Sequence, residues 1–293
     1  MTWRCTGIRW SDGRPDIGWT GREDRDSPLA PGQRLAFTAV GERRCLGVRR
    51  AGKRTPCPTG LAVPGRTGNA QCPECARLDR SFSVAADTNA ADPRPYRVYL
   101  AWFGPDTVKV GITAEERGPV RLLEQGAVTW TWLGRGPLMA ARRTEELLRA
   151  ALGVPDRIAY ARKRVLRGLL PAASERAREV AELYDRSAAL PGWPESLERL
   201  PRAVVDHAVP FGLAGLPVPA RVVTEMVPGG TVVGVLAGAA GPDLHLADGL
   251  VVDTRLLAGW ELAPVPGAVA AVTDVPLADI APPAPDAAQD GLF

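Results

Sequence analysis

The sequence predicts an α+β fold in three parts: an N-terminal β-rich module with a cysteine cluster, a central α/β domain, and a small C-terminal β domain. Three observations predict it. Four of the five cysteines fall within residues 45–75. Residues 96–190 alternate between β-type runs and helical runs. Residues 204–265 return to short Val-rich and Leu-rich runs divided by glycine pairs.

The composition is typical of a globular protein. With 293 residues, of which 45% are hydrophobic, the chain is long enough for about two domain cores. No run reaches the roughly 18 to 20 apolar residues of a membrane span, and the N-terminus lacks the plan of a signal peptide. We therefore expect a cytoplasmic protein with no membrane partner. In that compartment an odd number of cysteines favours metal ligands or free thiols over disulfides.

The net charge of +3 conceals an asymmetry along the chain. Residues 205–293 contain two arginines against ten acidic residues, so the preceding part of the chain is strongly basic. A basic half favours an anionic partner, and nucleic acid, either DNA or RNA, is the commonest partner of that kind. An arginine-rich solvated surface would give the same composition.

Residues 1–83 are expected to form the β-rich module. Residues 34–40 alternate as a strand does, and Gly41 is expected to end this strand. From Cys45 to Cys75 the chain is rich in Arg, Gly and Pro and has few large apolar residues. Hydrophobic burial cannot order this stretch, so another interaction must.

The cysteines supply that interaction. Cys72 and Cys75 form a CxxC pair, whose spacing lets two thiolates reach one tetrahedral metal ion. Cys45 and Cys57 lie upstream in the same stretch, so we predict a structural zinc site with Cys45, Cys57, Cys72 and Cys75 as ligands. A redox CxxC normally follows a buried strand, and no such strand is expected before Cys72. Cys5 is expected to be a free or buried thiol, although it is also an alternative fourth ligand.

The central domain is expected over residues 96–190, after a linker over residues 84–95 that lacks any periodicity. Its hairpin is predicted by two β-type runs around Gly104-Pro105-Asp106, and a shorter helix and a third strand follow. Two longer stretches then have apolar residues at helical spacing. The expected elements are strands at 96–103, 108–112 and 129–133 and helices at 137–152 and 171–190.

The C-terminal part is expected to be a small β domain over residues 204–265. Its strand candidates are 222–224, 231–237, 244–246 and 250–253. Residues 276–293 are expected to be a disordered tail. His207 and His245 lack the spacing of metal ligands, so we expect them in the core or on the surface.

Within residues 96–152, two strands, a helix with an arginine, a third strand and a helix with a glutamate follow one another. The first strand has an RVY triplet that ends at Tyr99, and the second has KVG, beginning at Lys109 within VKVGIT. The arginine is Arg121, and the glutamate is Glu145 in ARRTEELLRAAL, with Glu146 as the alternative register. This arrangement resembles the GIY-YIG nuclease domain. A lysine replaces the second motif tyrosine, and the family's late asparagine has no counterpart.

The resemblance implies a metal-dependent nuclease acting on nucleic acid, guided by the zinc module. Tyr99 would position or deprotonate a water molecule, Arg121 would grip the phosphate, and Glu145 would hold Mg²⁺. Lys109 would be placed to contact the phosphate. The two departures from the motif leave a non-catalytic, zinc-containing nucleic-acid-binding protein as an alternative, and a protein-interaction scaffold as a second. Ordinary structural roles also remain open, such as an ion pair between Glu145 and Arg149.

A second likeness covers residues 1–265. It includes the stretches YRVYLAW, VKVGIT, PVRLLEQGAV and VVGVLAGAAGPDLHLADGLVVDTRLLAG. These resemble an uncharacterised bacterial family that joins a cysteine cluster to a GIY-YIG-like domain and a C-terminal segment. Its members usually have two CxxC pairs. Here Val48 stands where the partner of Cys45 would be, and the resemblance implies that Cys57 substitutes for it.

Overall fold

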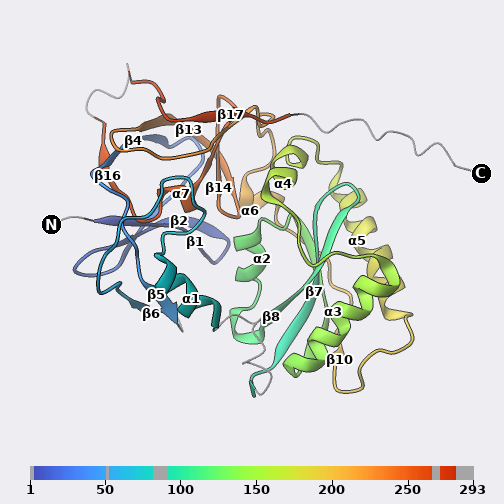
Figure 1. The fold of residues 1–293 in the computed structure, drawn as a ribbon. Helices are drawn as coiled ribbons and strands as arrows, with labels where there is room; N and C mark the ends of the chain where they lie inside the picture. Colours follow the sequence, from blue (N-terminus) through green and yellow to red (C-terminus); the bar gives the residue numbers. More distant parts are fainter. Residues whose placement is uncertain (1–2, 51–52, 82–91, 266–270, 282–293) are drawn as a thin grey trace, which may run out of the picture.

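The computed structural model describes residues 3–50, 53–81, 92–265 and 271–281. A ten-stranded sheet and a five-stranded sheet carry most of this chain, together with a two-stranded hairpin. The blue N-terminal strands and the orange and red C-terminal strands lie together in the large sheet, whereas the green and yellow central region forms the smaller one (Figure 1). No helix in the described ranges is long and apolar enough to cross a membrane.

The large sheet joins the two ends of the chain. Its strand order is β17-β12-β15-β14-β13-β4-β16-β1-β2-β3. The N-terminal strands are β1 (Arg4–Ser11), β2 (Arg14–Thr20), β3 (Arg25–Pro28) and β4 (Arg34–Val40). The C-terminal strands are β12 (Arg221–Val223), β13 (Thr231–Ala240), β14 (Asp243–Leu246), β15 (Leu250–Asp253), β16 (Glu261–Pro264) and β17 (Leu277–Asp279).

Strands from the two ends alternate at the centre of this sheet. β4 pairs with β13 on one side and with β16 on the other, and β16 also pairs with β1. The sequence assigns residues 1–83 and 204–265 to separate β modules, but their strands share one ladder of hydrogen bonds. Local alternation of apolar residues identifies a strand without identifying its neighbour, because the neighbour is chosen by pairing across the whole chain.

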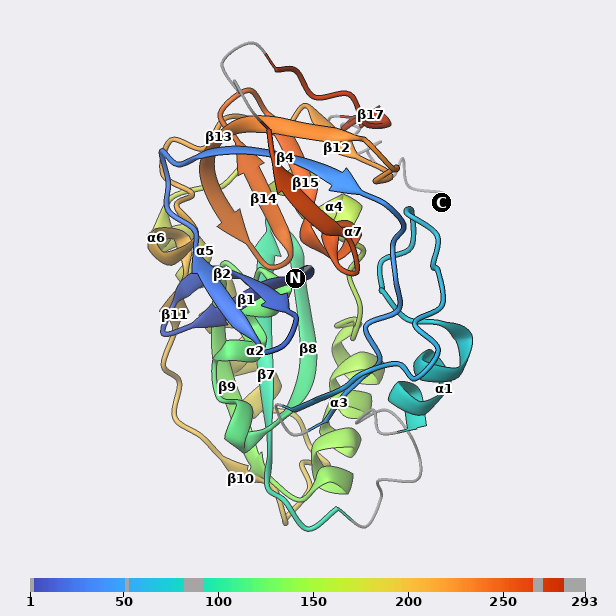
Figure 2. The same cartoon turned by 90° about the vertical axis from the view of Figure 1, so that its left-hand side faces the viewer.

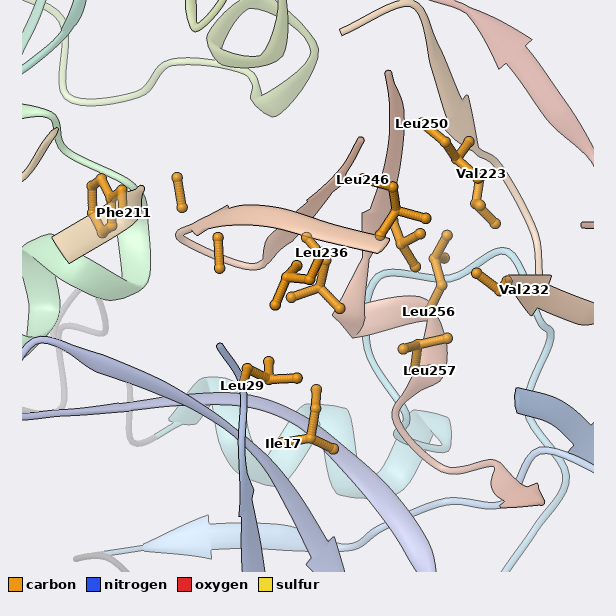
Figure 3. Close-up of a cluster of buried hydrophobic side chains, with 14 of the residues drawn as sticks. Ile17, Leu29, Phe211, Val223, Val232, Leu236, Leu246, Leu250, Leu256 and Leu257 are labelled. Atoms are coloured by element: carbon orange, nitrogen blue, oxygen red, sulfur yellow. The ribbon is translucent and has the colours of Figure 1, made fainter. Parts of the chain in front are cut away.

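Side chains from both ends fill the core of the large sheet. Ile17 and Leu29 come from the N-terminal strands and their connection, and Leu236, Leu246 and Leu257 come from the C-terminal part (Figure 3). All five are buried. Neither segment has this core without the other, so their hydrophobic burial stabilises both segments together.

The predicted disordered tail over 276–293 needs a correction. Leu277–Asp279 form β17, which pairs with β12 in antiparallel register. Backbone hydrogen bonds with β12 hold this short strand despite its flanking prolines, and the Leu277 side chain packs against the large core. Residues 282–293 lie outside the described residues, as do residues 84–91 of the predicted linker.

The central domain is built on the second sheet. The order is β10-β9-β7-β8, with β11 also paired to β9. β7 and β8 form the predicted hairpin, whose turn places Asp106 at a φ of 51°. The strands are β7 (Tyr96–Gly104), β8 (Thr107–Ala114), β9 (Thr129–Gly136), β10 (Glu198–Arg199) and β11 (Val205–Asp206). The helices are η2 (Glu115–Arg117), α2 (Val120–Gln125), α3 (Leu138–Leu152), α4 (Tyr160–Leu166) and α5 (Ala173–Ala188).

Helices cover both faces of β7, which is why almost every residue of this strand is buried. On one face, Val98 and Leu100 belong to a core that includes Leu148 of α3. On the other face, Tyr99 packs in a core with Leu122 of α2. The predicted long helices correspond to α3 and α5, and Gly153 ends α3 in a left-handed conformation with a φ of 68°.

Several short elements of the structure were not predicted from the sequence. α4 has no regular apolar stripe, and β10 and β11 are two-residue strands that add to β9 from beyond the predicted boundary at residue 190. α6 (Ala208–Phe211) and α7 (Thr254–Leu257) each have only four residues. Elements of this length leave no periodic pattern to read.

The cysteine-containing segment forms a third unit beside the two sheets. It contains β5 (Val48–Arg50), β6 (Lys53–Thr55) and α1 (Pro73–Ser81). Figure 2 places α1 to the side of the large and central sheets. The buried Arg43 ties this segment to the large sheet, since its guanidinium donates to the carbonyls of Ala258 and Arg255 at 2.8 Å each and to that of Thr67 at 2.9 Å.

Ion pairs between the two halves account for part of the charge asymmetry. Arg4 lies 2.6 Å from Glu261, and Arg164 lies 2.7 Å from Asp243. These pairs join arginines of the basic half to carboxylates of the acidic half.

Candidate functional site

The four cysteines that the sequence predicts as metal ligands lie close together in the structure. The Sγ atoms of Cys45, Cys57, Cys72 and Cys75 all lie within 4.8 Å of one another. The Sγ atoms of Cys57 and Cys72 are 3.9 Å apart. Tetrahedral coordination with Zn–S bonds of about 2.3 Å separates two sulfurs by about 3.8 Å. The group is thus arranged as a possible metal site.

The local backbone explains how Cys57 reaches this cluster. Gly47 has a φ of +80°, and a Cβ at this position would lie 2.0 Å from the carbonyl oxygen of Thr55. Glycine therefore lets the β5–β6 hairpin fold back tightly after Cys45. Cys57 follows this hairpin, so it can supply the ligand that Val48 cannot.

Hydrogen bonds and charge also favour a bound cation. The backbone amides of Cys72 and Gly47 donate to Cys45 Sγ at 3.1 and 3.4 Å. Burial raises the pKa of the Cys75 thiol, and the neighbouring cysteines raise it further. Four thiolates this close would repel one another, whereas a divalent metal ion would stabilise all of them.

Cys5 does not belong to this group. It is fully buried in the core of the large sheet, and its Sγ accepts a hydrogen bond from the Gly7 amide at 3.3 Å. Burial raises the pKa of its thiol to about 12. Cys5 is therefore a buried thiol, and the alternative that it serves as the fourth ligand is not supported.

Tyr99 occupies the centre of the second predicted site. It lies on β7 directly opposite Gly111 of β8. Only 1% of its surface is exposed, and its hydroxyl oxygen accepts a hydrogen bond from Gln125 Nε2 at 2.6 Å. A Cβ on Gly111 would lie 2.3 Å from that hydroxyl oxygen, so glycine at this strand position makes room for the tyrosine ring.

Lys109 lies two residues before Gly111 on β8. Its Nζ is 5.7 Å from the centre of the Tyr99 ring and donates to the backbone carbonyl of Asp156 at 3.1 Å. Burial and the nearby charge of Arg121 lower the pKa of Lys109 to about 8, against the opposing effect of Glu145. An amine with such a pKa is partly neutral near physiological pH.

Arg121 and Glu145 approach this pair from α2 and α3. Both side chains influence the pKa of Tyr99 and that of Lys109, which places all four groups within electrostatic reach. We call Tyr99, Lys109, Arg121 and Glu145 the Tyr99 cluster. The Arg121 side chain is 41% exposed and lies 3.4 Å from Glu124. Its guanidinium is thus open to an incoming anion.

The two glutamates of α3 differ in environment. Glu145 is half-buried, and burial and the carboxylate of Asp156 raise its pKa. Glu146 is exposed and pairs with Arg149 at 2.6 Å. The alternative register is therefore not supported, and the ion pair of Arg149 is formed with Glu146 instead of Glu145.

Three residues near the Tyr99 cluster were not predicted. Gln125 donates a hydrogen bond to the Tyr99 hydroxyl, and Lys163 donates one to the Gln125 carbonyl at 3.0 Å. The charge of Asp156 raises the pKa values of Lys109 and Glu145. Gln125 lies one helical turn after Arg121, which is a signal that sequence reasoning could have used. Asp156 and Lys163 lie in an irregular segment and on α4, and only the tertiary fold brings them here.

The buried Lys163 should make the free energy of unfolding depend on pH. It is 3% exposed, and its Nζ lies 3.9 Å from the centre of the Phe103 ring. Burial lowers its pKa from 10.5 to about 6, and the positive charges of Arg167, Lys109 and Arg121 add to this effect. The carboxylate of Asp243 opposes it. Between these two pKa values the unfolded chain binds more protons than the folded one, so the free energy of unfolding rises with pH.

We expect Lys163→Met to remove this dependence. Urea unfolding at pH 6.5 and 8.5 should show a rise in wild-type stability that the variant lacks, with a difference of about 2 to 3 kcal/mol. Lys53→Met, at an exposed lysine of β6, is the matched control and should behave as the wild type. Equal pH dependence in all three proteins would show that Lys163 is charged in the fold.

Comparison with known proteins places the chain in a family. No curated protein and no solved structure matches it. Residues 32–262 match the family described as "Protein of unknown function (DUF2797)". The match covers part of the large sheet, all four clustered cysteines and the Tyr99 cluster. Because it extends over more than half of the sequence, the chain belongs to this DUF2797 family.

Proposed function

We propose that this protein is a GIY-YIG-like, metal-dependent nuclease that binds and cleaves nucleic acid. The observation that carries the proposal is that the Lys109 amine lies 5.7 Å from the centre of the Tyr99 ring while the charges of Arg121 and Glu145 act on both groups. The order of β7, β8, α2, β9 and α3 supports the same proposal, since two strands, a helix with an arginine, a third strand and a helix with a glutamate form the resemblance.

The chemistry assigns a role to each group. Arg121 offers an exposed guanidinium to the phosphate, and Lys109 offers an amine that can accept a proton from the attacking water. Water oxygen then bonds to phosphorus while the bond to the leaving sugar oxygen breaks. Glu145, with Asp156 nearby, would hold Mg²⁺, and a bound Mg²⁺ supplies charge that stabilises the leaving oxygen.

The expected role of Tyr99 changes in this proposal. Its hydroxyl is buried and accepts a hydrogen bond from Gln125, which fixes the ring in place. Tyr99 is instead a positioning residue, whose ring lies beside the Lys109 amine. Lys109 takes the part that the resemblance implies for the tyrosine.

We propose zinc as the metal of the cysteine cluster. Four thiolates at tetrahedral spacing, with backbone amides directed at sulfur, are typical of structural zinc sites. The surrounding residues are poor in large apolar side chains. The metal would therefore order this segment and hold it beside the central domain.

Two variants separate binding from cleavage. Arg121→Ala should weaken nucleic-acid binding by about 1 to 3 kcal/mol, because it removes a charge-assisted phosphate contact. Glu145→Gln should leave binding equal or tighter and abolish Mg²⁺-dependent cleavage, because this anion helps only by holding the cation. Anisotropy without Mg²⁺ measures the first effect. Cleavage of supercoiled, branched and single-stranded DNA and of RNA, with Mg²⁺ or Mn²⁺, measures the second.

The control for Glu145 is its exposed neighbour. Glu146→Gln removes the same charge from the same helix turn and should change neither quantity. If Glu145→Gln weakens Mg²⁺-free binding as much as Arg121→Ala does, Glu145 is structural and the nuclease proposal fails.

A non-catalytic nucleic-acid-binding protein is the second candidate function. The complete burial of Tyr99 and the lysine in place of the second motif tyrosine favour it. Steeply salt-dependent binding with no cleavage of any substrate would select this function, because counterion release follows phosphate contacts whatever the chemistry. Absence of both activities would leave the protein-interaction scaffold.

A further inference from the structure

A cleft of about 520 Å³ lies where the cysteine-containing segment, the central domain and the large sheet meet. We call it the three-unit cleft. Arg54 and Asn69 contribute to its wall from the cysteine-containing segment, Arg121 and Tyr160 from the central domain, and Arg255 from the large-sheet unit. Arg121 also belongs to the Tyr99 cluster, so a phosphate held by this arginine would lie at the boundary between the cleft and the candidate active site.

The cleft contains an arginine whose guanidinium makes few hydrogen bonds within the described residues. Arg54 Nε is buried and has no hydrogen-bond partner among the described residues, and Arg54 Nη1 makes one long contact of 3.4 Å with the Leu46 carbonyl. Burial lowers the pKa of Arg54 and the charge of Arg49 lowers it further, while the carboxylates of Asp24 and Asp79 oppose this shift. An anion beside this guanidinium would supply the missing partner.

A second arginine is held in a fixed position. Arg255 donates to the Asp253 carboxylate through Nε at 2.9 Å and through Nη2 at 2.6 Å, and its guanidinium lies 4.0 Å from the centre of the Tyr160 ring. These contacts orient the side chain before any ligand binds. A preorganised donor loses little side-chain entropy on binding.

The wall also includes two carboxylates. Glu124 lies 2.6 Å from Arg117, so its charge is largely neutralised. Asp79, on α1, is exposed and faces an anionic ligand unfavourably. Arg255 is likewise paired with Asp253, so the charge that favours an anion comes from Arg54 and from the exposed guanidinium of Arg121. Asp79 opposes it, and its substitution should therefore strengthen binding.

We propose that the three-unit cleft binds a single-stranded segment of nucleic acid next to the phosphate held by Arg121. Arg54 contacts the phosphate next to the one held by Arg121. The cysteine-containing segment forms one wall of the groove in which the nucleic-acid strand lies. The volume is in the range of a pocket for one small organic ligand, which suits a nucleotide of a single strand. This inference rests on the proposed function, and it adds the strandedness of the substrate and a binding role for the metal-ordered segment.

The test uses the metal-loaded full chain and a fluorescent oligothymidylate. Arg54→Gln should weaken binding roughly tenfold and reduce the slope of log affinity against log salt by about 0.7, which corresponds to one lost contact on a single strand. Arg49→Gln is the matched control. Arg49 is exposed on β5, opposite Arg54 in the hairpin, and does not line the cleft, so its removal should change affinity less than twofold.

A gain in affinity distinguishes a binding effect from misfolding. Asp79→Asn should tighten binding severalfold, which a damaged protein would not do, because it removes an anion from the path of a polyanion. Glu74→Gln is its control, since Glu74 lies on the same helix, pairs with Arg77 at 2.6 Å, and does not line the cleft. Metal content, measured in parallel, should be unchanged in all four variants.

The outcomes distinguish this inference from the proposed function. If Arg54→Gln matches Arg49→Gln and Asp79→Asn matches Glu74→Gln, while Arg121→Ala still weakens binding, the cleft inference is wrong and the proposed function survives. A preference for duplex over single-stranded ligand, with the same variant effects, also overturns the single-strand assignment. A wild-type protein that binds no nucleic acid refutes both.

Discussion

Cys72→Ser is expected to abolish metal binding and to unfold the segment around residues 41–78. Cys72 is a buried member of the four-cysteine cluster, and its neighbours include few large apolar side chains that could hold the fold without the metal. Structural zinc contributes on the order of 10 kcal/mol to small domains at neutral pH. Elemental analysis should give about one zinc per wild-type chain and none in the variant, and limited proteolysis should cut the segment.

The remaining cysteine provides the control. Cys5→Ala alters the core of the large sheet and should leave the metal content unchanged. Freshly purified wild-type protein without metal, prepared under reducing conditions, would refute the site. Loss of metal in Cys5→Ala, together with its retention in Cys45→Ser, would show that Cys5 is a ligand.

Asp243→Asn is expected to destabilise the protein by about 3 to 5 kcal/mol, because it leaves the buried Arg167 without its counterion and removes one of the two carboxylates that pair with Arg164. Asp243 is fully buried on β14 and lies 2.7 Å from Arg164 and 2.6 Å from Arg167, both in the segment that begins with α4. Burial alone would raise the pKa of Asp243, but the charges of Arg167 and Arg164 lower it to about 2. This contribution is therefore complete above the ordinary pKa of 3.8 and is lost as the pH falls towards 2.

Urea unfolding at pH 7 measures this effect. Asp279→Asn, at an exposed carboxylate of β17, is the matched control and should change the free energy of unfolding by less than about 0.5 kcal/mol. A loss below about 1 kcal/mol in Asp243→Asn would mean that water or a local shift compensates the arginines. The central domain would then be held to the large sheet mainly by apolar contacts, such as that of Trp102 with the large core.

The sequence by itself identified the features whose physical cause is local. The β7–β8 hairpin follows from two β-type runs around Gly104-Pro105-Asp106, and α3 follows from its apolar spacing and from Gly153. The four cysteines could be grouped because a CxxC pair in a stretch so poor in apolar residues is the pattern expected of a metal site. The order of Tyr99, Lys109, Arg121 and Glu145 also needed only the sequence of elements.

Only the tertiary structure decided which elements share a surface. Residues 34–40 look the same in sequence whether they pair within an N-terminal module or, as they do, between β13 and β16. Strand pairing and burial depend on contacts between residues far apart in the chain, which periodicity does not report. For the same reason the burial of Tyr99 against Gln125, and the meeting of Arg54, Arg121 and Arg255 in one cleft, became visible only in the folded chain.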